Sequence, residues 1–319
     1  MKAAVYKGDI MKKALIRSVL FVFGLLLCLL PSPGDAFTLT VNCDKGQHIQ
    51  SLFGIVPLMD ITIIVKGTCN ENVLIDEKNV NITLNGGGTA TIHGPNPSSN
   101  TLAVNGRGIV IQGFYITGGY NGIQVRRGGT AIIDSNTIHD TNNHGIVVSD
   151  GGFATIINNT IRYNASNGIE VHDTAGAHIG FNQYSDTVTQ ANTVQNNGNQ
   201  GINVQRSAIA TVVGNYIENN YKNGILVQKN SHADISGNHI NGNGLITGAN
   251  GIRVQDGSGV NLGNSTGSTI YDLPNYTTAK NGNVGISCNL LGYADGLLGS
   301  LSGIYGQKGI SITCLDNLQ

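Results

Sequence analysis

The sequence predicts an all-β solenoid built from a repeated coil of about 23 residues. A five-residue word, in which Asn, His or Gln is followed by Gly-Ile-x-Val, recurs at residues 121–125, 144–148, 167–171, 200–204, 223–227 and 250–254. The glycines of successive words are 23, 23, 33, 23 and 27 residues apart. A period of this kind indicates stacked units, each of which buries its apolar face only against its neighbours. Functional side chains are therefore expected on the outside of the stack.

Two further motifs flank each word and predict two more strands per coil. Asn-x-Ile or Asn-x-Val precedes the word at residues 136–138, 159–161, 192–194, 215–217 and 238–240. A small-x-aliphatic triplet follows it at residues 131–133, 154–156, 177–179, 210–212 and 233–235. Each triplet alternates with a period of two, as a strand with one buried face does, and helical periodicity is absent from this region. Three short strands per coil are typical of a parallel β-helix.

These motifs resemble the right-handed parallel β-helix family, the pectin-lyase-like superfamily that includes pectin and pectate lyases and many bacterial cell-surface proteins. The resemblance covers roughly residues 108–260, and its right-handed coil agrees with the usual handedness of parallel crossovers. The catalytic words of the enzymatic members, R-x-P-x-x-R, N-T-D, G-H-G, R-I-K and D-P-H, are all absent. The resemblance therefore implies the fold and does not imply those activities.

The alternation within each word places Ile and Val inside the coil, stacked about 4.8 Å apart. The outward row of the same strand, from Gln124 to Arg253, is mixed, rich in amides and short of carboxylates. A column of asparagines at positions 136, 159, 192, 215 and 238 should also face inward at a corner. Its amides would then form hydrogen bonds up and down the stack, which satisfies buried polar groups.

The N-terminus has the features of a signal peptide over residues 1–36, with Met11 as an alternative start. Basic residues at positions 12, 13 and 17 precede an apolar run over residues 19–30 and a small-x-small site at residues 34–36. The run is shorter than the roughly 20 residues of a membrane span. We expect a secreted, periplasmic or cell-surface protein with no membrane span after signal removal. Residues 37–319 then form one β-helix domain with end caps.

The mature chain has four cysteines, which allow three disulfide pairings in an exported protein. Proximity in sequence favours Cys43 with Cys69 and Cys288 with Cys314. Metal ligation is less well supported because no C-x-x-C spacing occurs, and neither a metal nor another cofactor is expected. Ile49, Leu52, Phe53 and Val56 have helical spacing before Pro57, which predicts a short N-terminal capping helix. Residues 289–309 are expected to cover the other end.

A net charge of −1 without a basic stripe argues against nucleic acid as a partner. Two pairs of residues are candidates for catalysis. Asp150 and Asp173 occupy adjacent coils in one turn column, so their carboxylates would lie near the roughly 5–5.5 Å separation of retaining glycosidases. Because arginines flank them in the same column, a surface ion ladder explains the same residues. Glu170 with His172 is the other pair.

Two insertions, near residues 180–191 and 263–280, leave the stack at the same corner. They predict a groove bounded by the two inserted loops. They contribute Tyr184, Asp186, Tyr271 and Asp272, and the expected floor consists of Tyr216, Glu218, Asp234 and His239. Aromatic rings with scattered polar groups suit sugars, although tyrosine on an exposed strand also reflects β-propensity.

The sequence thus favours an exported β-helix protein that binds an extracellular or cell-envelope polysaccharide, or forms surface structure, without catalysis. The alternative is a polysaccharide lyase or glycoside hydrolase. An accessory role in metal-cofactor assembly is disfavoured because the eight histidines are dispersed and methionine is scarce.

Overall fold

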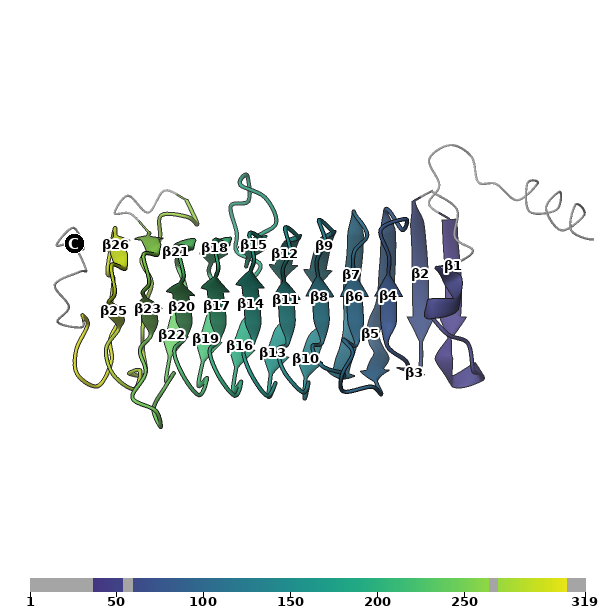
Figure 1. The fold of residues 1–319 in the computed structure, drawn as a ribbon, viewed down its shortest axis with the longest axis horizontal. Helices are drawn as coiled ribbons and strands as arrows, with labels where there is room; N and C mark the ends of the chain where they lie inside the picture. Colours follow the sequence, from purple (N-terminus) through teal and green to yellow (C-terminus); the bar gives the residue numbers. More distant parts are fainter. Residues whose placement is uncertain (1–36, 54–59, 264–268, 309–319) are drawn as a thin grey trace, which may run out of the picture. The chain divides into compact units, whose positions relative to one another are not determined.

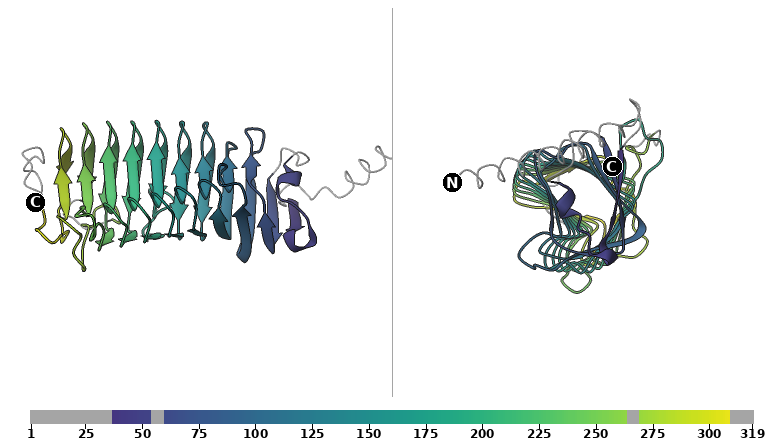
Figure 2. Two further views of the ribbon diagram at one scale, coloured as in Figure 1. Left: turned by 60° about the horizontal axis from the view of Figure 1, so that its bottom comes forward. Right: turned by 90° about the vertical axis from the view of Figure 1, so that its right-hand side faces the viewer.

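The computed structural model describes residues 37–53, 60–263 and 269–308. Its repeats form a right-handed parallel β-helix in which each coil contributes three short strands (Figure 1). Viewed down the axis, successive coils superimpose (Figure 2). The predicted fold class, period and strand count per coil are confirmed. The predicted signal peptide, residues 1–36, lies outside the described residues. Among those described, no helix has the length and apolar character of a membrane span.

The five-residue words form one sheet, here called sheet B. Its strands are β4 (Val73–Ile75), β6 (Leu102–Val104), β8 (Ile123–Val125), β11 (Ile146–Val148), β14 (Ile169–His172), β17 (Ile202–Gln205), β20 (Ile225–Gln228), β23 (Ile252–Val254) and β25 (Ile286–Cys288). Each Ile lies beside the Ile of the next coil, so the repeat in the sequence becomes an aligned stack.

The other two motifs form a second sheet, sheet A, with two rows of strands. The small-x-aliphatic row is β9 (Thr130–Asp134), β12 (Phe153–Ile157), β15 (Gly176–Ile179), β18 (Ile209–Val213), β21 (His232–Ser236), β24 (Gly259–Leu262) and β26 (Tyr293–Asp295). The Asn-x-Ile row is β10 (Thr137–His139), β13 (Thr160–Arg162), β16 (Thr193–Gln195), β19 (Tyr216–Glu218) and β22 (His239–Asn241).

The first coils of sheet A consist of β1 (Phe37–Asn42), β2 (Ile61–Lys66), β3 (Thr68–Asn70), β5 (Ile82–Gly94) and β7 (Ile109–Gly118). Of these, the long strands β5 and β7 join the two rows. Strand β7 pairs with β9 through its first part and with β10 through its last. This continuity around the corner makes the two rows one sheet.

The interior consists of the predicted aliphatic stacks. Ile169 and Val171 are fully buried and lie beside the equally buried Ile202 and Val204 of the next coil. Burial of one such side chain contributes about 1.5–3 kcal/mol, and the contribution is repeated in every coil.

The predicted asparagine column is confirmed as a hydrogen-bonded ladder. The Oδ1 of Asn215 accepts the backbone N–H of Asn192 at 3.0 Å and its Nδ2 at 2.8 Å. The Nδ2 of Asn215 donates to the carbonyl of Ile179 at 2.9 Å and to Oδ1 of Asn238 at 3.1 Å. The ladder extends one coil further, to Asn275. These contacts satisfy polar groups at a corner where water is excluded.

Two more ladders exist that the sequence analysis did not anticipate. One runs through asparagines at positions 164, 197, 220, 243 and 281. The other uses the first residue of each word: Oδ1 of Asn121 accepts the N–H of His144, and the contact recurs through Asn167, Gln200, Asn223 and Asn250. Side-chain amides thus hold the turns on both sides of the Asn-x-Ile strands.

The described parts of both ends consist of short elements. Within residues 37–53 the predicted helix is only a 3-10 turn, η2 (Gln50–Leu52), preceded by η1 (Cys43–Lys45); Val56 and Pro57 lie outside the described residues. Glu71 accepts the N–H groups of Ile49 and Gln50 at 2.8 and 3.0 Å. These N–H groups stand at the start of η2 and have no partner within it, so the Glu71 carboxylate caps the turn. At the other end, residues 289–308 continue the coil through β26 instead of forming a separate lid.

Candidate functional site

The outer face of sheet B carries two hollows on one row of side chains. The register aligns the outward residues of successive strands, which are Leu74, Ala103, Gln124, Val147, Glu170, Asn203, Leu226, Arg253 and Ser287. The first hollow, about 630 Å³, covers the early part of this row and includes Gln124 and Val147. The second, about 460 Å³, covers Leu226, Arg253 and Ser287. We call this row with its two hollows the sheet B groove.

The first hollow is lined by side-chain amides together with one arginine and two histidines. Arg126, His144 and His172 line it, together with Tyr120 at its edge. The floor amides are mutually oriented, since Nδ2 of Asn100 donates to Oε1 of Gln124 at 2.6 Å. Side chains fixed in this way present a defined set of polar atoms to a ligand.

The second hollow contains polar atoms that lack partners. Among the described residues, Nε of Arg253, Oε1 of Gln255 and Oδ1 of Asn250 and Asn289 are buried without a hydrogen bond. All four residues line this hollow. Buried polar atoms are almost always paired in proteins, so four unpaired atoms around one hollow are unusual.

Glu170 lies between the hollows and is saturated with hydrogen bonds. It is only 2% exposed. Its carboxylate accepts from the side-chain amides of Asn167, Asn203 and Gln205, the last at 2.6 Å. Because amide donors occupy its oxygens, Glu170 retains little capacity to contact a substrate. It organises the floor of the groove.

His144 replaces asparagine in the third ladder and is neutral at pH 7. Burial lowers the pKa of His144 below its usual 6.5, while the nearby Glu170 charge opposes this shift. Its Nδ1 accepts the N–H of Asn167 at 3.1 Å, so the ring proton is on Nε2. His144 therefore offers the hollow a hydrogen-bond donor.

The turn column beside the groove forms ion pairs. Asp173 lies 2.6 Å from Nε of Arg206 and 2.7 Å from Nδ1 of His172. Partial desolvation raises the pKa of Asp173, but the His172 hydrogen bond and the charges of His172 and Arg206 lower it more, so the pKa is lowered overall. Asp150 contacts the Ser149 hydroxyl at 3.4 Å. The Asp173 contacts fit the ion ladder, whereas the Asp150 contact is with a neutral hydroxyl. The catalytic role of Asp150 and Asp173 remains a prediction.

The two insertions contact one another and do not form two separate walls of a groove. The Tyr271 hydroxyl donates to the carbonyl of Gln183 at 2.9 Å, and the rings of Tyr184 and Tyr271 are 5.5 Å apart. Tyr184, Tyr271 and Asp234 line one hollow. Asp186 instead accepts hydrogen bonds within its own loop, and Asp272 accepts one from Thr269.

The remaining predicted residues lie together in a different place. Glu218 is 3.0 Å from Nδ1 of His239, and the His239 ring packs against Tyr216 and stacks on Tyr276. These residues belong to or flank β19 and β22, whereas Asp234 belongs to β21 in the other row of sheet A. The predicted single groove is thus divided into two clusters. The rings of His178 and Phe181 contact Tyr184, and Phe153 contacts His178. These aromatic residues were not identified from the sequence because their side-chain types do not recur from coil to coil.

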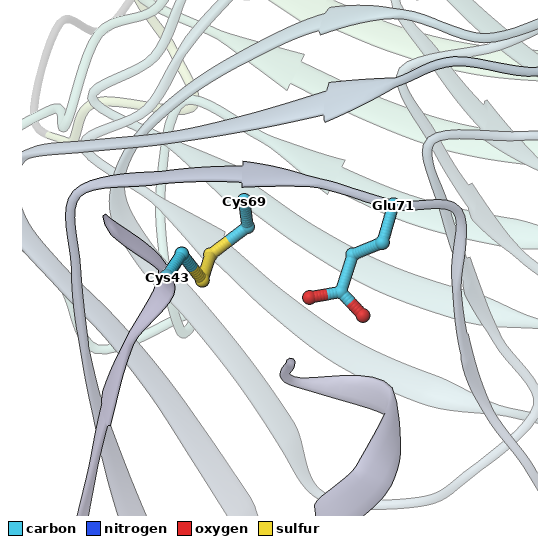
Figure 3. Close-up of side chains that lie close together, drawn as sticks. All are labelled: Cys43, Cys69 and Glu71. Carbon is cyan, nitrogen blue, oxygen red and sulfur yellow. A yellow bond between two sulfur atoms is a disulfide. The ribbon is translucent and has the colours of Figure 1, made fainter. Parts of the chain in front are cut away.

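The predicted Cys43–Cys69 disulfide is present (Figure 3). Glu71 lies close to both cysteines, but a disulfide offers no thiolate to a metal ion, and Glu71 is used by two backbone N–H groups. Cys288 is disulfide-bonded as well, whereas Cys314 lies outside the described residues.

Comparison with known proteins gives the family. The model of the right-handed β-helix region matches residues 62–188 and 178–291, together more than half of the chain. The chain therefore belongs to the right-handed β-helix family. No match was found among curated protein sequences.

Among solved structures, pectate lyase Pel9A is similar with a TM-score of 0.54 and 12% identity, over 87% of this chain and 80% of that one. A double mutant of the periplasmic alginate epimerase AlgG has a TM-score of 0.49 and 13% identity, over 86% and 81%. An alginate lyase from Paenibacillus sp. has a TM-score of 0.39 and 13% identity, over 86% and 96%. Identities this low establish only that the fold is shared.

Proposed function

We propose that this chain binds an acidic polysaccharide along the sheet B groove and does not cleave it. One observation carries the proposal. Apart from Tyr120, the ionisable side chains that line the two hollows are bases: Arg126, His144, His172, Lys222 and Arg253. Within the described residues, no carboxylate lines either hollow. A polymer with carboxylate groups would pair with these bases and with the oriented amides between them.

The geometry favours an extended ligand. Gln124 and Arg253 are five coil spacings apart along the row, which amounts to about 24 Å at about 4.8 Å per coil. The second hollow adds the side chains of Lys222, Arg253 and Ser287 at the far end. The Cys43–Cys69 disulfide supports an exported location, because disulfides persist in oxidising compartments.

Affinity electrophoresis tests the proposal with gels that contain polygalacturonate or alginate, against gels with neutral glucan. We expect retardation in the acidic gels, and at least about tenfold weaker binding after combined Arg126→Gln and Arg253→Gln substitution, because charge-assisted hydrogen bonds contribute about 1.5–3 kcal/mol each. The matched control is Lys66→Gln with Arg162→Gln, which removes the same charge from sheet A. Equal weakening by both pairs would indicate nonspecific attraction and reject the groove.

Cleavage of the same polymer is the second candidate function, and one contact favours it. His172 lines the first hollow, and Asp173 lies 2.7 Å from its Nδ1. A carboxylate in that position can orient an imidazole as a general base. Product analysis of the same incubations separates the candidates: new reducing or unsaturated ends that disappear in His172→Gln would establish an enzyme, whereas an intact polymer supports binding alone.

A further inference from the structure

Aromatic side chains gather at the corner where the two insertions meet. His178 of β15 stacks on Phe181 at 4.5 Å and meets Phe153 and Tyr184 edge-on at 5.0 and 5.1 Å. Tyr271, from the second insertion, contacts Phe181 at 5.2 Å. We call these five residues the aromatic cluster. It joins loops that are 88 residues apart in sequence through the hydrogen bond from Tyr271 to Gln183.

Tyr184 is the exposed member of the aromatic cluster and is nevertheless held in place. Tyr184 as a residue is 65% exposed. His178 and Tyr271 contact its ring, and its hydroxyl lies 3.4 Å from Oγ1 of Thr211. A large ring that is both exposed and fixed presents apolar surface to a ligand at little further cost in side-chain entropy.

Two hollows meet at Tyr184. One, about 370 Å³, is lined by Asp234, Asn261 and Tyr271. The other, about 330 Å³, is lined by Phe153, Ser207 and Ile209. Tyr184 and Thr211 line both and so form the ridge between them. Apolar walls with a few oriented polar groups are the usual composition of a small-molecule site.

The charge of these hollows differs from that of the sheet B groove. No lysine or arginine among the residues of known position lines either one. Asp234 borders the first hollow, where Nδ2 of Asn261 donates to its carboxylate at 2.9 Å. His178 lines the second of these hollows. Burial lowers the pKa of His178, and a hydrogen bond that its ring donates to the backbone of Asn182 partly opposes this shift. His178 is thus neutral at pH 7, and the Asp234 carboxylate lies 3.2 Å from Nε2 of His232. The described lining therefore offers an acidic sugar no lysine or arginine to pair with.

From this geometry we infer a second carbohydrate site, for neutral sugars, at the aromatic cluster. The C–H face of one sugar ring packs on Tyr184, and its hydroxyls donate to Asp234 and accept from Asn261. The adjoining ring lies against Phe153 and Ile209. The site is on sheet A and the insertions, so it does not depend on the sheet B groove. A chain with both sites would connect an acidic polymer to a neutral one.

Isothermal titration with soluble neutral glucan, galactomannan and xylan tests this inference. We expect binding to at least one of them, weakened at least about tenfold by Tyr184→Ala and by less than about threefold by Tyr184→Phe, which keeps the ring. Tyr221→Ala, at another exposed tyrosine, is the control and should leave binding unchanged.

The two proposals fail separately. The Arg126→Gln and Arg253→Gln double variant should bind the neutral polymer as the unaltered chain does. No binding to any neutral polymer, or equal loss in Tyr184→Ala and Tyr221→Ala, would overturn the second site and leave the groove untouched. A melting temperature equal to that of the unaltered chain would show that each exposed substitution leaves the fold intact.

Discussion

Asn215→Ala is expected to lower the free energy of unfolding by about 4 kcal/mol or more, because each buried polar group left unpaired costs about 1–3 kcal/mol. The substitution removes the acceptor for the N–H and Nδ2 of Asn192, and the donor to the carbonyl of Ile179. Neighbouring coils fix these groups in position, so the chain cannot easily rotate them toward water. Urea unfolding followed by circular dichroism measures the effect.

Asn182→Ala is the matched control. Asn182 is exposed, and its side chain forms no hydrogen bond with any residue whose position is described. Its replacement should change the free energy of unfolding by no more than about 0.5 kcal/mol. Equal effects of the two substitutions would contradict a stabilising role for the ladder.

Ile202→Ala is expected to cost about 2–5 kcal/mol, the usual range for removing a large aliphatic side chain from a core. Ile202 is fully buried in the sheet B stack, between Ile169 and Ile225. The cavity cannot collapse, since the stacked coils hold the strands at a fixed spacing. Thermal and urea unfolding of the variant give the change.

Ile209→Ala makes the same chemical change on the outside of the next strand, where Ile209 is 61% exposed. Its expected cost is at most about 0.5 kcal/mol. Ile202 faces the interior, whereas Ile209, seven positions later, faces solvent, so the same substitution compares the two orientations. A larger loss for Ile209 than for Ile202 would contradict the inward orientation of the words.

The repetitive part of the fold was predictable because one physical constraint recurs in every coil. Ile202 and Val204 must face inward if the word is to stack on itself, and Asn215 must satisfy the corner that this stacking buries. The second ladder was predictable in principle, since Asn164, Asn197, Asn220 and Asn243 each follow a first-ladder asparagine by five residues. The predicted capping helix is a single 3-10 turn in its described part, and the contact of Glu71 with its first N–H groups could not be read from the sequence.

The candidate sites were less predictable because they depend on segments that do not repeat. The amide-rich outward row was visible in the sequence, but the hollows also need corner residues such as Tyr120 and Lys222. The common corner of the two insertions followed from their lengths. The contact between Tyr271 and Gln183 did not, because no period fixes the conformation of a loop.

The sheet B groove is tested most directly by hydroxyl-radical footprinting with a saturating acidic oligosaccharide. Tyr120 borders the groove and Tyr216 lies on sheet A, and the two are similarly exposed, at 47% and 45%. An oligosaccharide bound in the sheet B groove is expected to protect Tyr120 and to leave the oxidation rate of Tyr216 unchanged. Protection of Tyr216 without protection of Tyr120 would place the ligand on the other sheet and contradict it.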